Sequence, residues 1–285
     1  MRQVRGCRLH QLKGETNEIA GTLVDTRGGA EMNIFPNMKF LSVGDVTIEY
    51  EERGRGEPIV LVHGGVFSDW FVPLAATEAL AGFRVVRVRR PGYGANRPKQ
   101  HVSIIDHARL VAAVADELAL GKAHWVGHSS SCAIVLQVAA DRPELVQSLS
   151  LIEPAPTGVF QTAAGNELLP QFIGPAMGAF AGGDVADAFD TFLRGVGGDG
   201  QQAVVEGRLG KDGYERAIKE SPFFFADELR AVQEWAFTKA DASRLAQPTL
   251  ILEGGSQPAH LGPMSHQVSA ATSALMKNSE VVIIP

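Results

Sequence analysis

The residues best suited to chemistry lie around position 129. A short apolar strand over 123–127 runs into a tight turn with Ser129 at its tip, and an apolar helix follows over 130–141. This arrangement is typical of a nucleophile elbow, which projects a serine hydroxyl from the end of a sheet. The crowded turn needs small residues two before and two after the serine, where Gly127 and Ser131 stand. The N–H groups that begin the helix would favour negative charge at the reacting centre.

Strands and helices alternate through most of the chain. A hairpin is predicted over 39–43 and 46–52, followed by strands over 58–62, 83–88, 123–127, 148–152, 248–253 and 280–284. Helices are predicted over 69–81, 103–120, 130–141 and 264–277, with Ser103 and Asp106 as the capping pair of the second. This order predicts an α/β fold with a mostly parallel sheet and right-handed crossovers.

Two segments depart from the alternation. Residues 1–37 have neither helical nor strand periodicity, which predicts an irregular extension, with a leader strand packed on the domain as the alternative. Residues 154–246 contain no convincing strand and are rich in Ala, Gly and Phe, which favours a helical cap inserted between two strands. The expected core is therefore 38–153 with 247–285, and the cap would cover the site.

Composition excludes several classes of protein. A net charge of -6 argues against nucleic-acid binding. The two cysteines, Cys7 and Cys132, cannot form a disulfide framework, which favours a reducing compartment and a cytoplasmic location. No apolar run approaches the roughly 18 residues of a membrane span. No pattern of metal ligands is present, so we expect neither metal nor cofactor.

Three motifs together resemble the α/β-hydrolase superfamily, in its capped, serine-dependent branch, over residues 38–285. They are His63-Gly64-Gly65, the Arg-Pro-Gly-Tyr-Gly run over 90–94, and Gly127-His128-Ser129, which follow the third, fourth and fifth strands. The resemblance implies an eight-stranded, mostly parallel sheet with an inserted helical cap. It also implies Ser129 as the nucleophile and an oxyanion hole made by the backbone N–H groups of Gly65 and Ser130.

The catalytic acid of this superfamily most often follows the seventh strand. Gln257 occupies that position here and cannot carry the charge that stabilises an imidazolium. Some members place the acid after the sixth strand, where this chain has Glu153. The resemblance therefore implies Glu153 as the orienting acid, and the alternative is a polar residue that closes the strand.

The superfamily's catalytic histidine follows the eighth strand, but this chain stops at Pro285, without that loop or the final helix. One interpretation is a C-terminal truncation relative to a working enzyme. The other is that His260, three residues beyond Gln257, serves as the base. His266 is expected on the following helix, and the side chain of His128 is expected to point away from the site.

The resemblance implies a cofactor-free serine hydrolase that cleaves a small-molecule carboxylic ester or lactone through an acyl-enzyme. A serine in the elbow argues against haloalkane dehalogenases and epoxide hydrolases, which use aspartate there. The apolar cap suggests a bulky, apolar substrate, with a macrolide-type lactone as one guess. Two alternatives stay open. The chain could bind an apolar ligand without turnover, or a second copy could supply the covering helix in a homodimer.

Overall fold

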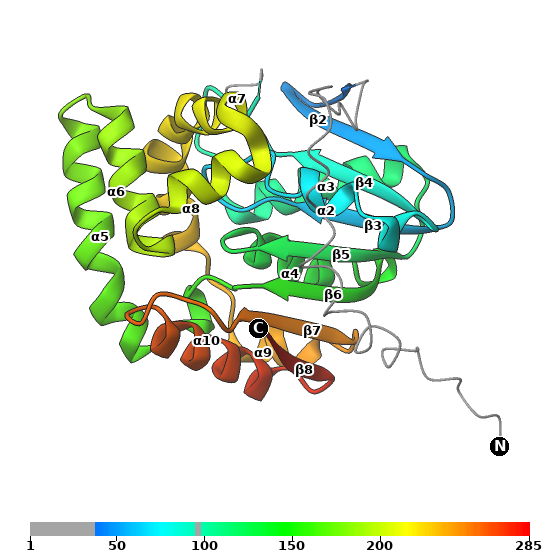
Figure 1. Cartoon of the computed structure of the whole chain (residues 1–285). Helices are drawn as coiled ribbons and strands as arrows, with labels where there is room; N and C mark the ends of the chain where they lie inside the picture. The colour runs from blue at the N-terminus through cyan, green and yellow to red at the C-terminus, as the bar shows by residue number, and fades with distance from the viewer. Residues whose placement is uncertain (1–37, 95–97) are drawn as a thin grey trace. The chain divides into compact units, whose positions relative to one another are not determined.

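A computed structural model describes residues 38–94 and 98–285 (Figure 1). The strands form a single eight-stranded sheet in the order β1-β2-β4-β3-β5-β6-β7-β8. The irregular extension predicted over 1–37, which includes Cys7, lies outside the described residues.

The sheet is antiparallel at one edge and parallel elsewhere. Strands β1 (Lys39–Val43) and β2 (Val46–Arg53) form the predicted hairpin, and β2 pairs antiparallel with β4. The remaining pairs are all parallel, and these strands are β3 (Glu57–Val62), β4 (Phe83–Arg89), β5 (Ala123–His128), β6 (Val146–Ile152), β7 (Thr249–Gly254) and β8 (Ser279–Ile284). Parallel strands that are covered on both faces read as apolar runs, as β3 does. The predicted α/β fold is confirmed.

Most helices of the core follow their predicted ranges. They are α3 (Ile104–Glu117), α4 (Ser131–Asp141) and α10 (Gly262–Leu275). Ser103 caps α3 as predicted: its Oγ accepts the Asp106 N–H at 3.1 Å, and the Asp106 carboxylate accepts the Ser103 N–H at 3.3 Å. Single 3-10 turns cover Pro143–Leu145 (η3) and Gly158–Phe160 (η4).

The helix predicted over 69–81 is wrong. This segment forms only α2 (Val72–Ala75) and the 3-10 turn η2 (Glu78–Leu80). Thr77 separates them with an extended backbone, at φ -68° and ψ 147°, and its hydroxyl donates to the Leu74 carbonyl at 2.8 Å. Threonine competes with the helix in this way because its side chain offers the backbone another hydrogen-bond partner.

Between β6 and β7 the described chain contains helices and no strand. They are α5 (Ala163–Ala181), α6 (Val185–Gly197), α7 (Gln201–Phe223), the π-helix η5 (Phe224–Glu228), α8 (Leu229–Glu234) and α9 (Lys239–Arg244). Helices α5 and α6 lie beyond one end of the strands in Figure 1. An apolar cluster that includes Phe189, Tyr214 and Phe225 joins α6, α7 and η5. Trp235 and Leu245 belong instead to the main core of the sheet. The predicted cap over 154–246 stays a prediction.

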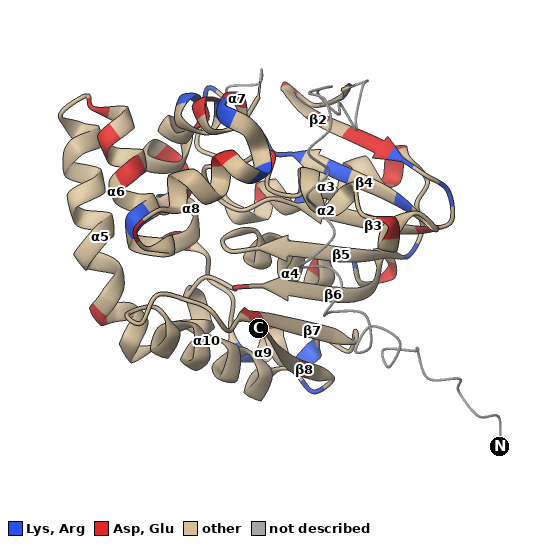
Figure 2. Cartoon of the chain, in the orientation of Figure 1, with Lys and Arg blue, Asp and Glu red and all other residues tan. Residues whose placement is uncertain are grey.

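Charged residues are frequent on β2 and β4, whereas β5 and β6 carry almost none (Figure 2). The register pairs Glu49 with Arg89 and Glu51 with Arg87, and both glutamates form ion pairs with the opposite arginine. Both arginines also contact Asp69, at 2.9 and 3.0 Å. These ion pairs tie the loop after β3 to the neighbouring strands.

None of the helices among residues 38–94 and 98–285 has the length and apolar character that crossing a bilayer requires.

Candidate active site

Ser129 occupies a strained turn between β5 and α4. Its φ is +53°, in the left-handed region that non-glycine residues rarely adopt. Its N–H donates to the Ile152 carbonyl at 2.9 Å, which ties the turn to the end of β6. Ser131 braces the turn, because its Oγ accepts the His128 N–H at 2.8 Å and donates to the Val62 carbonyl at 2.5 Å. This local geometry is that of the predicted elbow.

Glycines at two positions let neighbouring backbone approach the elbow. A Cβ at Gly127 would lie 2.7 Å from the Ser131 carbonyl oxygen. A Cβ at Gly64 would lie 2.7 Å from the His128 carbonyl oxygen and 3.0 Å from the Cβ of Ser129. The turn after β3 therefore packs directly on the serine, and it brings Gly65 to the same end of the sheet.

His63 holds this turn rather than facing the serine. Its Nε2 accepts the Arg90 N–H at 3.1 Å, so its proton lies on Nδ1, which donates to the Gly64 carbonyl at 2.7 Å. Burial, with the Arg90 charge next in effect, lowers the pKa of His63 well below its usual value. A neutral, fully buried ring with two hydrogen bonds braces the turn.

A buried polar cluster that the sequence does not predict lies behind the turn. Glu228, from the π-helix η5, has a fully buried side chain whose Oε1 accepts the Ser130 hydroxyl at 2.5 Å and Arg90 Nη2 at 2.9 Å. Its Oε2 accepts the Tyr93 hydroxyl. Arg90 and Tyr93 belong to a motif that the sequence analysis quoted without assigning them a role. No sequence signal marks Glu228, which lies 98 residues from Ser130.

Glu153 stands at the end of β6, beside the position where the superfamily more often places its acid. Its Oε1 accepts the Gly254 N–H and the Gln257 side-chain amide, each at 2.5 Å. Burial raises the pKa of Glu153, and the hydrogen bonds from Gly254, Ser265 and Gln257 act in the opposite direction. Gln257, at the position where the acid more often stands, therefore donates a hydrogen bond to the Glu153 carboxylate.

Other groups engage His260, the base considered from the sequence, and also His266 and His128. His260 is exposed, and its Nε2 lies 2.9 Å from the Gly195 carbonyl of α6. His266 lies on α10 with its Nδ1 3.7 Å from Glu253. His128 stacks on Trp70 at 4.3 Å between ring centroids, and burial lowers its pKa to about 3. Among the described residues, no histidine forms a hydrogen bond with Ser129.

Aromatic side chains cover the turn beside the elbow. A Cβ at Gly65 would lie 2.5 Å from the ring of Phe224, which in turn contacts Phe192 at 4.6 Å and Phe225 at 5.2 Å between centroids. The phenylalanine run over 223–225 packs within the protein. Any group bound at this turn would meet apolar rings.

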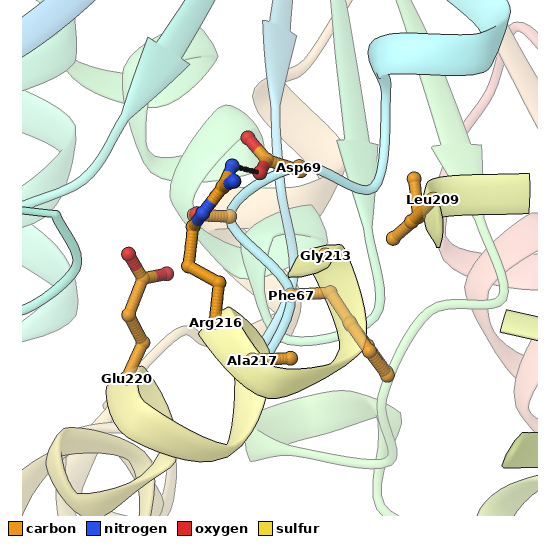
Figure 3. A pocket seen from close by; sticks show the side chains of 8 residues that line it. Phe67, Asp69, Leu209, Gly213, Arg216, Ala217 and Glu220 are labelled. Atoms are coloured by element: carbon orange, nitrogen blue, oxygen red, sulfur yellow. Dashed lines mark hydrogen bonds and ion pairs between the residues drawn. The ribbon is translucent and has the colours of Figure 1, made fainter. Parts of the chain in front are cut away.

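Figure 3 shows a separate shallow hollow between the loop after β3 and α7 that has no interior space for a ligand. An ion pair between Asp69 and Arg216 crosses its rim. Burial acts to raise the pKa of Asp69, but nearby arginines, Arg216 among them, hold it below its usual value. Ser129 does not line this hollow.

The described residues contain no group of three or more histidine, cysteine, aspartate or glutamate side chains placed to hold a metal ion.

Comparison with protein families agrees with this geometry. The model of the alpha/beta hydrolase family matches residues 59–285, most of the chain. This chain belongs to the alpha/beta hydrolase family. The match covers the turn after β3, the elbow and the segment between β6 and β7, so the three motifs of the sequence analysis lie inside it.

Among curated relatives, the acetyltransferase component of the acetoin cleaving system of Pseudomonas putida is 34% identical over 156 residues, 52% of this chain and 40% of that protein. The 2-hydroxy-6-oxo-6-phenylhexa-2,4-dienoate hydrolase of Comamonas testosteroni is 29% identical over 135 residues, 44% of this chain and 46% of that protein. This alpha/beta hydrolase thus matches less than half the length of either relative.

Among solved structures, the enol-lactonase of Burkholderia xenovorans LB400 superposes with a TM-score of 0.68 at 18% identity. The match covers 86% of this chain and 90% of that one. At this identity the similarity concerns the fold alone.

Proposed function

We propose that this alpha/beta hydrolase cleaves a carboxylic ester or lactone through an acyl-enzyme on Ser129. The observation that carries the proposal is the left-handed backbone of Ser129, at φ +53°, at the tip of a strand–turn–helix unit. Such strain persists only where the surrounding structure enforces it, and it concentrates at functional sites. The name of one curated relative, a dienoate hydrolase, supports a hydrolytic reaction.

In this proposal the Ser129 oxygen attacks the acyl carbon while a base takes the hydroxyl proton. The N–H groups of Gly65 and Ser130 hold the resulting oxyanion, and the alcohol leaves with a proton. Water then attacks the acyl-enzyme, the acid is released, and Ser129 regains its proton. Glu153 orients the base and stabilises its protonated form.

His260 as the base remains part of the proposal. To reach Ser129 its ring would have to leave the Gly195 carbonyl, which is a rearrangement of an exposed side chain. The phenylalanine cluster around Phe224 supports an apolar acyl group in the substrate. The cytoplasmic location, the homodimer and the absence of nucleic-acid binding remain predictions from the sequence.

A second candidate function is binding of an apolar ligand without turnover. The described histidines favour it, because none forms a hydrogen bond with Ser129 and His260 is engaged by α6. The two functions differ in a measurable way, since only the first makes product in a Ser129-dependent manner.

The test is hydrolysis of p-nitrophenyl butyrate by the 285-residue chain and by Ser129→Ala. The expected loss is at least ~10³-fold in kcat/KM, as for removal of a nucleophile in other serine hydrolases. Ser243→Ala, which changes an exposed serine on α9, is the matched control and should leave the rate within a factor of about two.

Equal rates in wild type and Ser129→Ala would overturn the proposal. If turnover depends on Ser129, His260→Ala decides the base: a loss of similar size assigns it, and an unchanged rate excludes it. If there is no turnover, equilibrium dialysis with butyrate-sized and larger apolar acids tests the binding function.

A further inference from the structure

Glu228 sits where two elements of the proposed oxyanion hole meet. It ends the π-helix η5, on the segment between β6 and β7, and its side chain is fully buried. One oxygen of its carboxylate accepts from both Ser130 and Arg90, at 2.5 and 2.9 Å. A buried carboxylate is retained only when it is well paired, because removal from water is costly.

Through Arg90 the carboxylate reaches the Gly64–Gly65 peptide. Arg90 Nη2 also donates to the Gly64 carbonyl at 2.9 Å, and its Nε donates to the His63 carbonyl at 3.0 Å. In a trans peptide the carbonyl and the following N–H point in opposite directions. Holding the Gly64 oxygen therefore sets the direction of the Gly65 N–H.

The second donor, the Ser130 N–H, belongs to the Ser129–Ser130 peptide. The Ser129 carbonyl accepts the Cys132 N–H at 3.0 Å and the Ala155 N–H at 3.4 Å, so the Ser129–Ser130 peptide has a defined plane. The Ser130 side chain is then anchored on Glu228. In both peptides, hydrogen bonds hold the carbonyl oxygen opposite the N–H group. Glu228 contacts a side chain beside each peptide, Arg90 for the first and Ser130 for the second.

The chemistry of this site favours a carboxylate. Three donors converge on it, from Ser130, Arg90 and Tyr93, and an ionised carboxylate only accepts hydrogen bonds. Its negative charge would oppose an oxyanion nearby, but the fully buried Arg90 guanidinium pairs with it and offsets that charge. The Tyr93 hydroxyl also accepts the Val66 N–H at 3.2 Å, which fixes the next peptide of the turn.

We propose that Glu228 is a positioning residue that holds the Gly65 and Ser130 N–H donors in the geometry needed to bind a developing oxyanion. This inference rests on the proposed serine-hydrolase function and deepens it. Glu228 acts through Ser130 and Arg90 and does not itself touch the substrate. It also makes the helical segment between β6 and β7 a structural part of the active site.

The experiment compares kcat and KM of Ser130→Ala and Glu228→Gln with wild type, using p-nitrophenyl butyrate. Ser130→Ala keeps the backbone donor and removes only the hydroxyl that joins Ser130 to Glu228. Because the oxyanion forms in the transition state, kcat should fall about 10- to 100-fold while KM changes less than about twofold. Glu228→Gln puts an amide N–H group where one carboxylate oxygen accepts from Ser130, Arg90 or Tyr93, so a donor faces a donor. This variant should lower kcat at least as much as Ser130→Ala.

Glu220→Gln is the matched control. Glu220 is also buried, lies on α7 (Figure 3) and accepts a backbone N–H, that of Gly94, at 3.0 Å from the same loop, but it has no contact with Ser130 or Arg90. Its kcat should stay within about twofold of wild type. Near-ultraviolet circular dichroism and thermal unfolding show whether each variant folds. If Glu228→Gln fails to fold, Ser130→Ala decides the question alone.

Folded Ser130→Ala with an unchanged kcat would overturn the inference while leaving Ser129-dependent hydrolysis intact. Absence of Ser129-dependent turnover in wild type is instead a failure of the proposed function. In that case ¹⁵N relaxation of the Gly65 and Ser130 amides decides: order parameters should fall from about 0.85 in wild type to below about 0.6 in Ser130→Ala but not in Glu220→Gln. Unchanged order parameters would overturn the inference.

Discussion

Backbone strain at single residues clusters around the candidate site. Among the described residues, four other than glycine have a left-handed φ: Val66, Ala119, Ser129 and Glu153. Three of them follow the carboxyl ends of β3, β5 and β6, and only Ala119 lies elsewhere, after α3. Each such residue costs roughly 1–2 kcal/mol. The strain at Glu153 is thus an observation, separate from the resemblance, that favours a functional role for this carboxylate.

Replacing Glu153 by glutamine should separate activity from stability. Glutamine keeps the Oε1 acceptor for Gly254 and Gln257 but removes the charge, so we expect hydrolysis to fall about 10³- to 10⁴-fold, as when the acid of a triad is neutralised. The pKa of Glu153 is raised in the folded state, so its ionisation destabilises the fold at neutral pH. Glu153→Gln should therefore raise Tm, by about 2 °C at pH 7.

The Tm difference should disappear as the pH falls through the folded pKa of Glu153 towards its unfolded value, because the wild-type carboxyl then becomes neutral too. Differential scanning calorimetry at pH 7 and pH 4.5 measures it. Glu253→Gln, at the buried end of β7, is the control for activity and should stay within about twofold of wild type. Full activity in Glu153→Gln would contradict the assigned role.

At the scale of elements, helix α7 is interrupted at Gly210. Gly210 has φ +73° and ψ 168° inside Gln201–Phe223, so two helical stretches meet there at a kink. Gly207, one turn earlier, has no left-handed φ, and a Cβ there would meet nothing within 4 Å. Two glycines of the same helix therefore have different backbone requirements.

Alanine at these positions should change stability in opposite directions. Gly207→Ala should raise the free energy of unfolding by about 0.5–1 kcal/mol, because alanine restricts the unfolded chain and suits a helix. Gly210→Ala should lower it by about 1–2 kcal/mol, because a side chain at positive φ is strained although its Cβ has open space. Urea unfolding of the two variants measures both values, and a stabilising Gly210→Ala would show that α7 straightens.

For the whole molecule, buried neutral histidines link folding to pH. Burial lowers the pKa of His63 and His107 well below 6.5, and that of His128 to about 3. Below pH 6.5 these three histidines bind protons in the unfolded chain but stay neutral in the folded protein. Folding stability is thus complete above pH 6.5 and declines as the pH falls below it.

Acidification from pH 7 to 5.5 should lower the free energy of unfolding by about 4 kcal/mol, from three groups at up to ~1.4 kcal/mol per pH unit each. His107 offers a control variant, because neither ring nitrogen has a hydrogen-bond partner among the described residues. His107→Leu should remove about one third of the loss and stabilise the protein at pH 7 by about 1–3 kcal/mol. Urea unfolding at the two pH values tests this, and a stability that rises on acidification would contradict it.

Local patterns were enough to predict the strand–turn–helix unit at Ser129, the capping pair at Ser103 and Asp106, and most strands. These features depend on residues within a few positions of one another, so the sequence alone specified them. The helix predicted over 69–81 failed because the Thr77 side chain competes with the backbone, which periodicity does not register.

Only the tertiary structure decided which distant groups meet. Glu228 joins Ser130 across 98 residues and Tyr93 across 135, and Gln257 joins Glu153 across 104. Such contacts depend on the path of the helices between β6 and β7, and a buried carboxylate looks in sequence like any solvated one. The sequence by itself determined the α/β fold and the strand–turn–helix unit at Ser129, because both follow from patterns of neighbouring residues. The contacts of Glu228 behind the proposed oxyanion hole come from chain segments that only folding brings together.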